Sequence, residues 1–288
     1  MMFITGCHRS GTSMLACLMK NIIGETADER TQLLPALDNP QGFYESTMFT
    51  ALNEYLLELS GFGWDTPPLL KIDWSDYKYI NYLFTKRSNF YSIAMKNTWI
   101  EKDPRLCITA PAMEHLFLRR VPIMAILRDP SEVAISLFRR NGMPYMYGLT
   151  IWFLYNYHLA ASLRSNDLLL IYDQLITEKV TSHKSTKSLA KIESFLLNHE
   201  LDISSKISID LFESLPIIPQ LNRSSSYSPS ATEAAWQENP LCHHCTTIYH
   251  EIAKSTEMRI STFQQVFSAV PRTVLDVIAP LGFWQWKR

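Results

Sequence analysis

The sequence has no long apolar stretch and no surplus of charge of either sign. The longest candidate for a membrane span, Thr150 to Leu163, is shorter than the roughly 20 residues that such a helix needs, and it contains Asn156 and His158. The formal net charge of -1 provides no general attraction to nucleic acid or to membranes. We therefore expect a soluble globular protein without a transmembrane segment and without a nucleic-acid partner, in which any anion site is local.

The chain also lacks a regular set of cysteines. Five cysteines are an odd number without regular spacing, which argues against a disulfide framework in 288 residues. The segment "CHHC" at Cys242 to Cys245 has a spacing that could supply zinc ligands together with His250. A structural zinc site usually takes a second pair of ligands from a distant segment, and the sequence contains no second pair. We expect free thiols and no metal site.

A signal peptide is missing as well. Phe3 to Thr5 already resemble a strand that feeds a loop, which leaves no room for the charged start and apolar middle of a leader. If Met1 is the true start, the expected location is the cytoplasm. The length favours a single domain over 1–288, with a core at 1–226 and a helical C-terminal extension at 227–288.

Short apolar runs alternate with helical stretches along the first 180 residues or so. The pattern predicts strands at 3–5, 97–100, 121–127 and 167–172, and helices at 12–23, after Ser46, after Ser75, through 113–117, and at 131–140 and 150–163. This alternation predicts an α/β fold of the P-loop nucleotide-binding kind, with a parallel sheet flanked by helices. Beyond about residue 180 the pattern becomes almost wholly helical.

Four polar clusters follow the predicted strands. They are Gly6 to Ser13, Lys102 to Arg105, Arg128 to Pro130, and Tyr172 with Asp173. Ligands of parallel sheets bind beyond the carboxyl ends of the strands. We therefore expect the four clusters to converge on one edge of the sheet.

The first cluster, "GCHRSGTS", has the frame of a phosphate-binding loop. Two glycines are separated by four residues, and a hydroxyl opens the helix that follows. Backbone N–H groups at a helix N-terminus and the helix dipole favour an anion at such a loop. Thr12 stands where ATP- and GTP-binding loops have lysine, and Arg9 lies inside the loop.

No predicted strand ends in a free acidic residue suited to holding magnesium. Asp103 and Asp129 each precede a proline, and Asp173 starts a predicted helix. A donor with a single group beyond one phosphate, which needs no metal, fits the loop better than a nucleoside triphosphate. Adenosine 3′-phosphate 5′-phosphosulfate (PAPS) is such a donor.

Six segments resemble, in this order, the motifs of PAPS-dependent sulfotransferases: "GCHRSGTSMLACLM", "DNPQGFYES", "EKDPRLC", "ILRDPSEVAISLFRRNG", "LLLIYDQLI" and "LNRSS". The resemblance is greatest to the stand-alone bacterial type with an H-R-S-G-T-S loop, and it covers roughly Phe3 to Ser226. It implies metal-independent transfer of a sulfuryl group from PAPS to a hydroxyl or amine, with adenosine 3′,5′-bisphosphate as the product.

The resemblance also implies which residues bind the donor. The 5′-phosphosulfate would be held by the loop residues Cys7, His8, Arg9, Ser10, Gly11, Thr12 and Ser13. Arg128, Ser136 and Arg140 resemble the 3′-phosphate motif, and positions 136 and 140 are one helical turn apart, so that both can reach one phosphate. Tyr172 either contacts the nucleotide or belongs to the core, and Arg223 resembles a late basic residue that closes over the donor.

Two residues are expected to carry the chemistry. Lys102 resembles the lysine that stabilises the leaving phosphate in tyrosylprotein sulfotransferases. The histidine that follows this lysine in the cytosolic small-molecule enzymes is replaced by Asp103, so the base should be a carboxylate. Glu45 is favoured over Glu25 for that role, and His8 is an alternative proton carrier.

The acceptor pocket is expected from residues 28–40, 61–91 and 142–152, which are aromatic and proline-rich and indicate a partly apolar site. A small-molecule, glycan, lipid or peptide acceptor would fit that description. Trp152, Tyr155 and Tyr157 either line the pocket or belong to the core. Two other functions stay open, namely a nucleoside-triphosphate-dependent kinase and a non-catalytic nucleotide-binding protein.

Overall fold

A computed structural model describes residues 1–23, 33, 42–95, 99–177, 187–201, 239–255, 259–272 and 274–275 of the chain. None of the helices within these ranges combines the length and the apolar character that crossing a membrane requires.

The described strands form one parallel sheet. Its members are β1 (Met2–Thr5), β2 (Ile100–Lys102), β3 (Ile123–Leu127) and β4 (Leu168–Ile171), in the spatial order β2-β1-β3-β4. From β1 the chain goes first to one side and then crosses to the other, so the order reverses between β1 and β3. The crevice at such a reversal is where α/β sheets bind ligands. The parallel sheet of the sequence-based prediction is confirmed.

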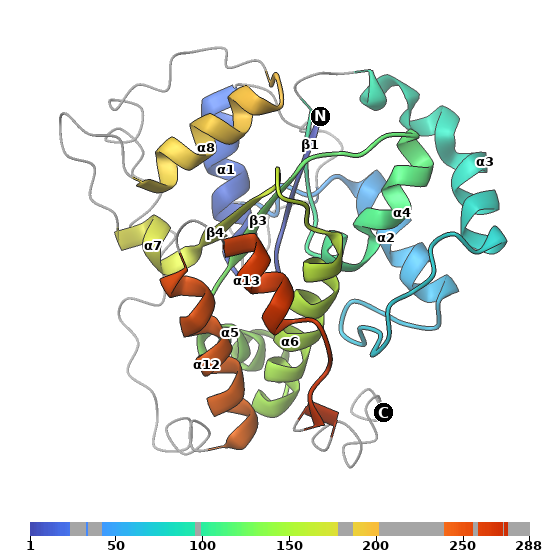
Figure 1. The fold of residues 1–288 in the computed structure, drawn as a ribbon. Coiled ribbons are helices and arrows are strands. Elements are labelled where there is room, and N and C mark those ends of the chain that lie inside the picture. Colours follow the sequence, from blue (N-terminus) through green and yellow to red (C-terminus); the bar gives the residue numbers. More distant parts are fainter. Residues whose placement is uncertain are drawn as a thin grey trace.

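Helices cover both faces of the sheet. They are α1 (Thr12–Ile23), α2 (Thr47–Leu59), α3 (Tyr77–Ala94), α4 (Leu106–Phe117), α5 (Pro130–Asn141), α6 (Tyr145–Ser162), α7 (Tyr172–Thr177), α8 (Lys187–Asn198), α12 (Pro240–Lys254) and α13 (Arg259–Val266). Figure 1 shows α1 and α8 together on one side of the strands, with α4 and α2 on another side and α3 outside them.

Alternation along the strands produces two cores. Ile4 and Ile126 join the core made with α1 and α8. Their neighbours Phe3 and Ala125 join the core made with α2 to α6, α12 and α13. Because successive side chains of a strand point to opposite faces, a strand covered by helices on both sides must be apolar throughout. This explains the uncharged run that predicted β3.

Several predicted boundaries can be compared with the structure. The helix at 12–23 is confirmed, and Ser46 caps α2 by accepting a hydrogen bond from Phe49 N at 3.2 Å. The helix predicted at 150–163 begins earlier, at Tyr145, because Pro144 occupies the N-cap position. Tyr172 was predicted to end a strand and instead begins α7, directly after β4.

The C-terminal helices pack against the second core. α12 contacts α5 and α6, and α13 contacts α6 and β4. Cys242 and Cys245 lie within α12 and are buried, and the Cys242 sulfur is 3.1 Å from the Tyr145 hydroxyl and 3.4 Å from the Ser131 hydroxyl. No cluster of three metal-ligating side chains occurs among the residues that the structure describes. The expected boundary at residue 226 falls outside these residues.

Candidate active site

The loop Gly6 to Ser13 connects β1 to α1 and lies tightly against β3 and Tyr172. A Cβ atom on Gly11, whose φ is +91°, would lie 2.5 Å from the Tyr172 ring. A Cβ atom on Gly6 would lie 2.4 Å from the carbonyl oxygen of Ile126. Glycine is therefore required at both positions by close approach, and at Gly11 also by the left-handed backbone. The two glycines of the motif let the loop fit the crevice between β1 and β3.

Arg9 connects this loop to α5. Its Nε donates a hydrogen bond to the Ser136 hydroxyl at 2.9 Å, and its carbonyl oxygen accepts one from Arg128 at 2.9 Å. The Arg128 guanidinium also lies 4.4 Å from the centre of the Tyr172 ring and pairs with Glu132. The residues predicted to hold the 3′-phosphate thus lie on the same edge of the sheet as the phosphate loop.

Arg140 reaches the same edge from the last turn of α5. Its guanidinium lies 5.7 Å from the centre of the Phe43 ring, and the Phe43 carbonyl oxygen accepts a hydrogen bond from Lys102 at 3.1 Å. Phe43 and the loop residue Ser13 are also joined, because the Ser13 hydroxyl donates to the same carbonyl at 3.3 Å. Arg140 and Lys102 therefore both contact Phe43, Arg140 at its ring and Lys102 at its carbonyl oxygen.

Ser10 offers a direct test of whether the loop suits an anion. Its hydroxyl is buried, and it has no hydrogen-bond partner among the described residues. A buried polar atom without a partner costs free energy unless a ligand or water satisfies it. The buried hydroxyl belongs to the loop that leads into α1, whose N-terminus favours an anion.

Lys102 and Glu45 form a buried ion pair beside the loop. The Lys102 ammonium donates to Glu45 Oε1 at 2.5 Å, to the Phe43 carbonyl and to the Ser13 hydroxyl at 3.3 Å. An ammonium group has three N–H donors, so these contacts satisfy all of them. The two residues that the sequence predicted as catalytic are therefore in direct contact.

Arg105 completes this cluster and was not among the predicted site residues. Its guanidinium lies 3.5 Å from the second oxygen of Glu45, 3.0 Å from Asp103 and 2.7 Å from Glu54. Although burial opposes its charged form, Asp103 and Glu45 raise the pKa of Arg105. The only signal in the sequence was its place directly after the Lys-Asp-Pro segment.

The electrostatics of Glu45 result from opposing effects. Burial raises the pKa of Glu45 above its usual range, while the neighbouring Lys102 and Arg105 act to lower it. With a cation on each oxygen, the carboxylate is both desolvated and paired. Its basicity therefore depends on whether Lys102 remains beside it.

Glu101 supports the turn that carries Glu45. Its two oxygens accept hydrogen bonds from Ser46 N at 3.2 Å and from Trp99 Nε1 at 3.3 Å. Burial raises the pKa of Glu101 to about 8, so the group is largely protonated at neutral pH. Tyr44, two residues before Ser46, has a left-handed φ of 56°, a backbone conformation that residues other than glycine rarely adopt. The strained turn is thus fixed from β2 by Glu101.

His8 is the loop residue whose side chain packs in an aromatic cluster. Its Nε2 lies 3.1 Å from the Tyr155 hydroxyl, which donates its proton to the Trp64 carbonyl at 2.7 Å. Because the Tyr155 proton is used in that bond, His8 Nε2 must be the donor to Tyr155. Burial, followed by the charges of Arg105 and Lys102, lowers the pKa of His8 well below its usual value. His8 is therefore a neutral imidazole that anchors the loop to Tyr155.

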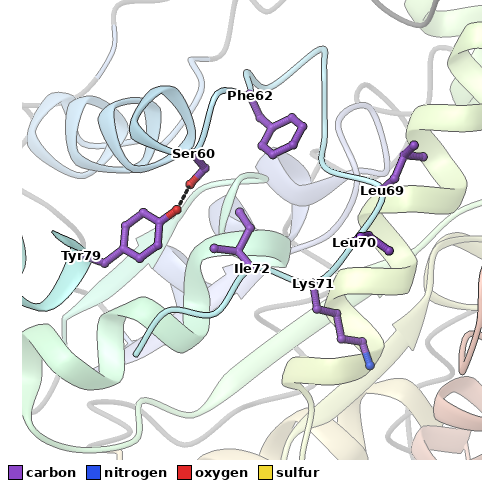
Figure 2. Close-up of a pocket in the computed structure, with 7 residues that line it drawn as sticks. All are labelled: Ser60, Phe62, Leu69, Leu70, Lys71, Ile72 and Tyr79. Carbon is purple, nitrogen blue, oxygen red and sulfur yellow. Dashed lines mark hydrogen bonds between the residues drawn. The ribbon is translucent and has the colours of Figure 1, made fainter. Parts of the chain in front are cut away.

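An open cavity of about 380 Å³ lies between the end of α2 and the start of α3. Figure 2 shows its lining, with Phe62 and Ile72 facing the space, the Ser60 and Tyr79 hydroxyls joined by a hydrogen bond, and the amino group of Lys71 pointing away. The cavity lies within the segment 61–91 that was expected to shape a partly apolar acceptor pocket.

The structure separates the three aromatic candidates for that pocket. Trp152 is fully buried and donates to the Arg128 carbonyl at 2.9 Å, so it supports the strand end rather than lining a cavity. Tyr155 is fully buried against His8. Tyr157 is also buried and belongs to the core, with the Lys71 amino group 5.3 Å from its ring centre.

Three other predicted site residues have different outcomes. The Cys7 side chain is fully buried in the core, and burial raises the pKa of its thiol well above the usual value. Arg223 and Glu25 lie outside the described residues, so their predicted roles are not compared with the structure.

The chain was compared with known proteins. No family model matches it, and no curated protein matches it. Among solved structures, its fold is similar to the sulfotransferase domain from the Synechococcus PCC 7002 olefin synthase. The two share 14% sequence identity with a TM-score of 0.43, and the match covers 98% of this chain and 94% of the other.

Proposed function

We propose that this protein is a sulfotransferase that moves a sulfuryl group from PAPS to a hydroxyl or amine. The observation that carries the proposal is the position of the loop Gly6 to Ser13 between two groups of side chains. In the middle of the loop Arg9 contacts Ser136 and Arg128. At the last residue of the loop Ser13 contacts Lys102. A doubly phosphorylated adenosine needs cations at two separate places, which this arrangement provides.

The residues divide into binding and chemistry within this proposal. The loop, with the unpartnered Ser10 hydroxyl, holds the 5′-phosphosulfate, and Arg128, Ser136 and Arg140 hold the 3′-phosphate. Their cations neutralise the donor without a divalent metal. Thr12, in place of lysine, is consistent with a donor that has no β- and γ-phosphates.

The transfer itself uses Lys102 and Glu45. A bond forms between the acceptor atom and sulfur while the bond from sulfur to the bridging oxygen breaks, and Lys102 stabilises the negative charge on that leaving oxygen. When its ammonium moves from Glu45 to the leaving oxygen, the carboxylate loses its nearest cation and becomes a stronger base. Glu45 then accepts the acceptor's proton.

The binding half of the proposal is tested by calorimetry with adenosine 3′,5′-bisphosphate. Removing the hydroxyl in Ser136→Ala or the cation in Arg128→Ala should weaken binding by about tenfold or more, since a charge-assisted hydrogen bond contributes about 1.5–3 kcal/mol. Arg139→Ala, on the exposed side of the same helix, is the matched control. Equal affinity of all four proteins would refute the 3′-phosphate site, and tighter binding of ATP with magnesium would favour a kinase.

The chemical half is tested by product mass with a panel of hydroxyl and amine acceptors and labelled PAPS. Glu45→Gln keeps an acceptor for Lys102 and should bind the bisphosphate normally while losing transfer. Full activity of Glu45→Gln would place the base elsewhere.

A further inference from the structure

The outer surface of α3 carries a row of exposed apolar side chains, which we call the α3 stripe: Tyr77, Phe84, Tyr91 and Met95. Their exposed fractions are 77%, 63%, 67% and 68%. They are separated by seven, seven and four positions, so at 3.6 residues per turn they fall within an arc of roughly 40° along about 27 Å of helix. Figure 1 shows α3 at the periphery of the molecule, beyond α4.

The stripe is not part of the core. The opposite face of α3 provides the buried residues Tyr79, Leu83, Phe90 and Ile93, and that face packs against α4. Four large apolar side chains in one row on the outside of a helix form a patch larger than isolated surface residues require. Such patches mark surfaces that contact another phase or another molecule.

The charged side chains of α3 itself are all cationic. From Tyr77 to Met95 the sequence contains Lys78, Lys86 and Arg87 and no acidic residue. On a helical wheel Arg87 lies roughly 40° beyond one edge of the stripe and Lys78 roughly 100° beyond the other, whereas Lys86 falls on the packed face. Arg87 also donates a hydrogen bond to the His115 carbonyl at 2.8 Å, and its guanidinium lies 5.0 Å from the centre of the Phe84 ring. The nearest acids on this segment, Asp73 and Asp76, precede the helix and are held in hydrogen bonds with Ser75 and Lys78 N.

The end of the helix continues the same character. Arg119 donates a hydrogen bond to the Ala94 carbonyl at 2.8 Å, which places it and its neighbour Leu118 beside the last turn of α3. Leu118 is 72% exposed. A further cation thus lies beside the last turn of α3, and the residue before it in the sequence is an exposed leucine.

The shape of the surface limits what can cover it. The stripe residues stand on a convex outer helix, about 10 Å apart along its axis, with the small polar residues Asn81 and Ser88 between them. A helix that docks on a protein normally needs a groove or a continuous seam of apolar contacts. A lipid surface adapts to each separated side chain, and aromatic residues with flanking cations are suited to the boundary between headgroups and acyl chains. A second copy of α3 would bring cations against cations.

We propose that α3 is a docking surface for an anionic lipid bilayer, on which the stripe inserts at the headgroup boundary while Lys78, Arg87 and Arg119 contact lipid phosphates. This inference is independent of the proposed function. It predicts that the protein associates with membranes peripherally and reversibly, with an affinity that falls as salt increases.

The test is flotation of the full chain with vesicles of phosphatidylcholine alone or mixed with phosphatidylserine. The wild-type protein should float with the mixed vesicles at low salt and much less with phosphatidylcholine alone. The triple variant Tyr77→Ser, Phe84→Ser, Tyr91→Ser should bind the mixed vesicles at least about tenfold more weakly than wild type, because it loses the inserted apolar area. Leu197→Ser, which removes an exposed leucine from α8, is the matched control and should bind like wild type.

A second measurement reports the stripe directly. The five cysteines are buried, so a single Phe84→Cys variant can carry an environment-sensitive fluorophore. Its emission should shift to the blue on addition of the mixed vesicles. Failure of the wild-type protein to float, or equal flotation of the triple variant, would refute the proposal. A wild-type oligomer that becomes a monomer in the triple variant would assign the stripe to a protein interface and would also overturn it.

Discussion

Glu101 allows a quantitative prediction of how the free energy of unfolding depends on pH. The residue is buried, and the hydrogen bonds of its carboxyl group within the described part of the chain come from N–H donors. The group has an ordinary pKa of 4.5 and a pKa of about 8 in the folded protein. Between these pH values the folded chain retains a proton that the unfolded chain has lost, so stability should fall as the pH rises from about 5 to about 8. The difference corresponds to at most roughly 5 kcal/mol in the free energy of unfolding.

The perturbation is Glu101→Gln, which has nearly the same shape and cannot ionise. Its amide oxygen can still accept from Ser46 N, while its NH₂ group faces the Trp99 N–H, so we expect a constant loss of about 1–2 kcal/mol at low pH. That loss does not depend on pH. The stability of wild type relative to the variant should therefore fall by up to roughly 5 kcal/mol between pH 5 and pH 8, and the two stabilities should cross at about pH 5–6, where wild type has lost about 1–2 kcal/mol.

The assay is urea unfolding, followed by tryptophan fluorescence at several pH values, with the denaturation midpoint compared between the two proteins. Other groups contribute to the wild-type slope; His158, whose pKa burial lowers to about 4, makes stability rise with pH. These contributions cancel in the difference between variant and wild type. Parallel curves for the two proteins would show that Glu101 is ionised in the folded state and would refute the reasoning.

Two further changes test the loop. Gly11→Ala would place a methyl group 2.5 Å from the Tyr172 ring at a φ of +91°, so the loop must shift. Calorimetry should then show that most of the affinity for adenosine 3′,5′-bisphosphate is lost. Unaltered affinity would contradict the packing of the loop. Tyr155→Phe removes the hydroxyl between His8 and the Trp64 carbonyl. We expect a lower denaturation midpoint, equivalent to a loss of about 1–2 kcal/mol in the free energy of unfolding. An unchanged midpoint would mean that this hydrogen-bond chain does not stabilise the fold.

Local patterns in the sequence were sufficient for the elements that frame the site. The glycine spacing and the apolar run before it predicted β1, the loop and α1, and the uncharged segment at 121–127 predicted the buried strand. These signals depend on neighbours within about ten residues, since strand and helix periodicity and capping are local properties. The convergence of the polar clusters also followed, because the ends of parallel strands share one edge.

The long-range contacts did not follow from the sequence. Nothing near Arg105 indicated that it would hold Glu45, which lies far away along the chain, and nothing near Tyr155 indicated that it would orient His8. The predicted start of α6 was also wrong, because burial of Tyr145 and the preceding proline decide where that helix begins. Such contacts depend on which helix covers which face of the sheet.

The outer face of α3 illustrates the same division. Its sequence alone predicted no more than a helix after Ser75. Only packing against α4 determined that Tyr79 and Phe90 are buried and that Tyr77, Phe84 and Tyr91 are exposed. The sequence by itself thus determined the phosphate loop, the strands and their common edge, because periodicity and turn chemistry act over short distances. The tertiary structure decided which charges pair and which apolar side chains remain outside, because burial is a property of the whole fold.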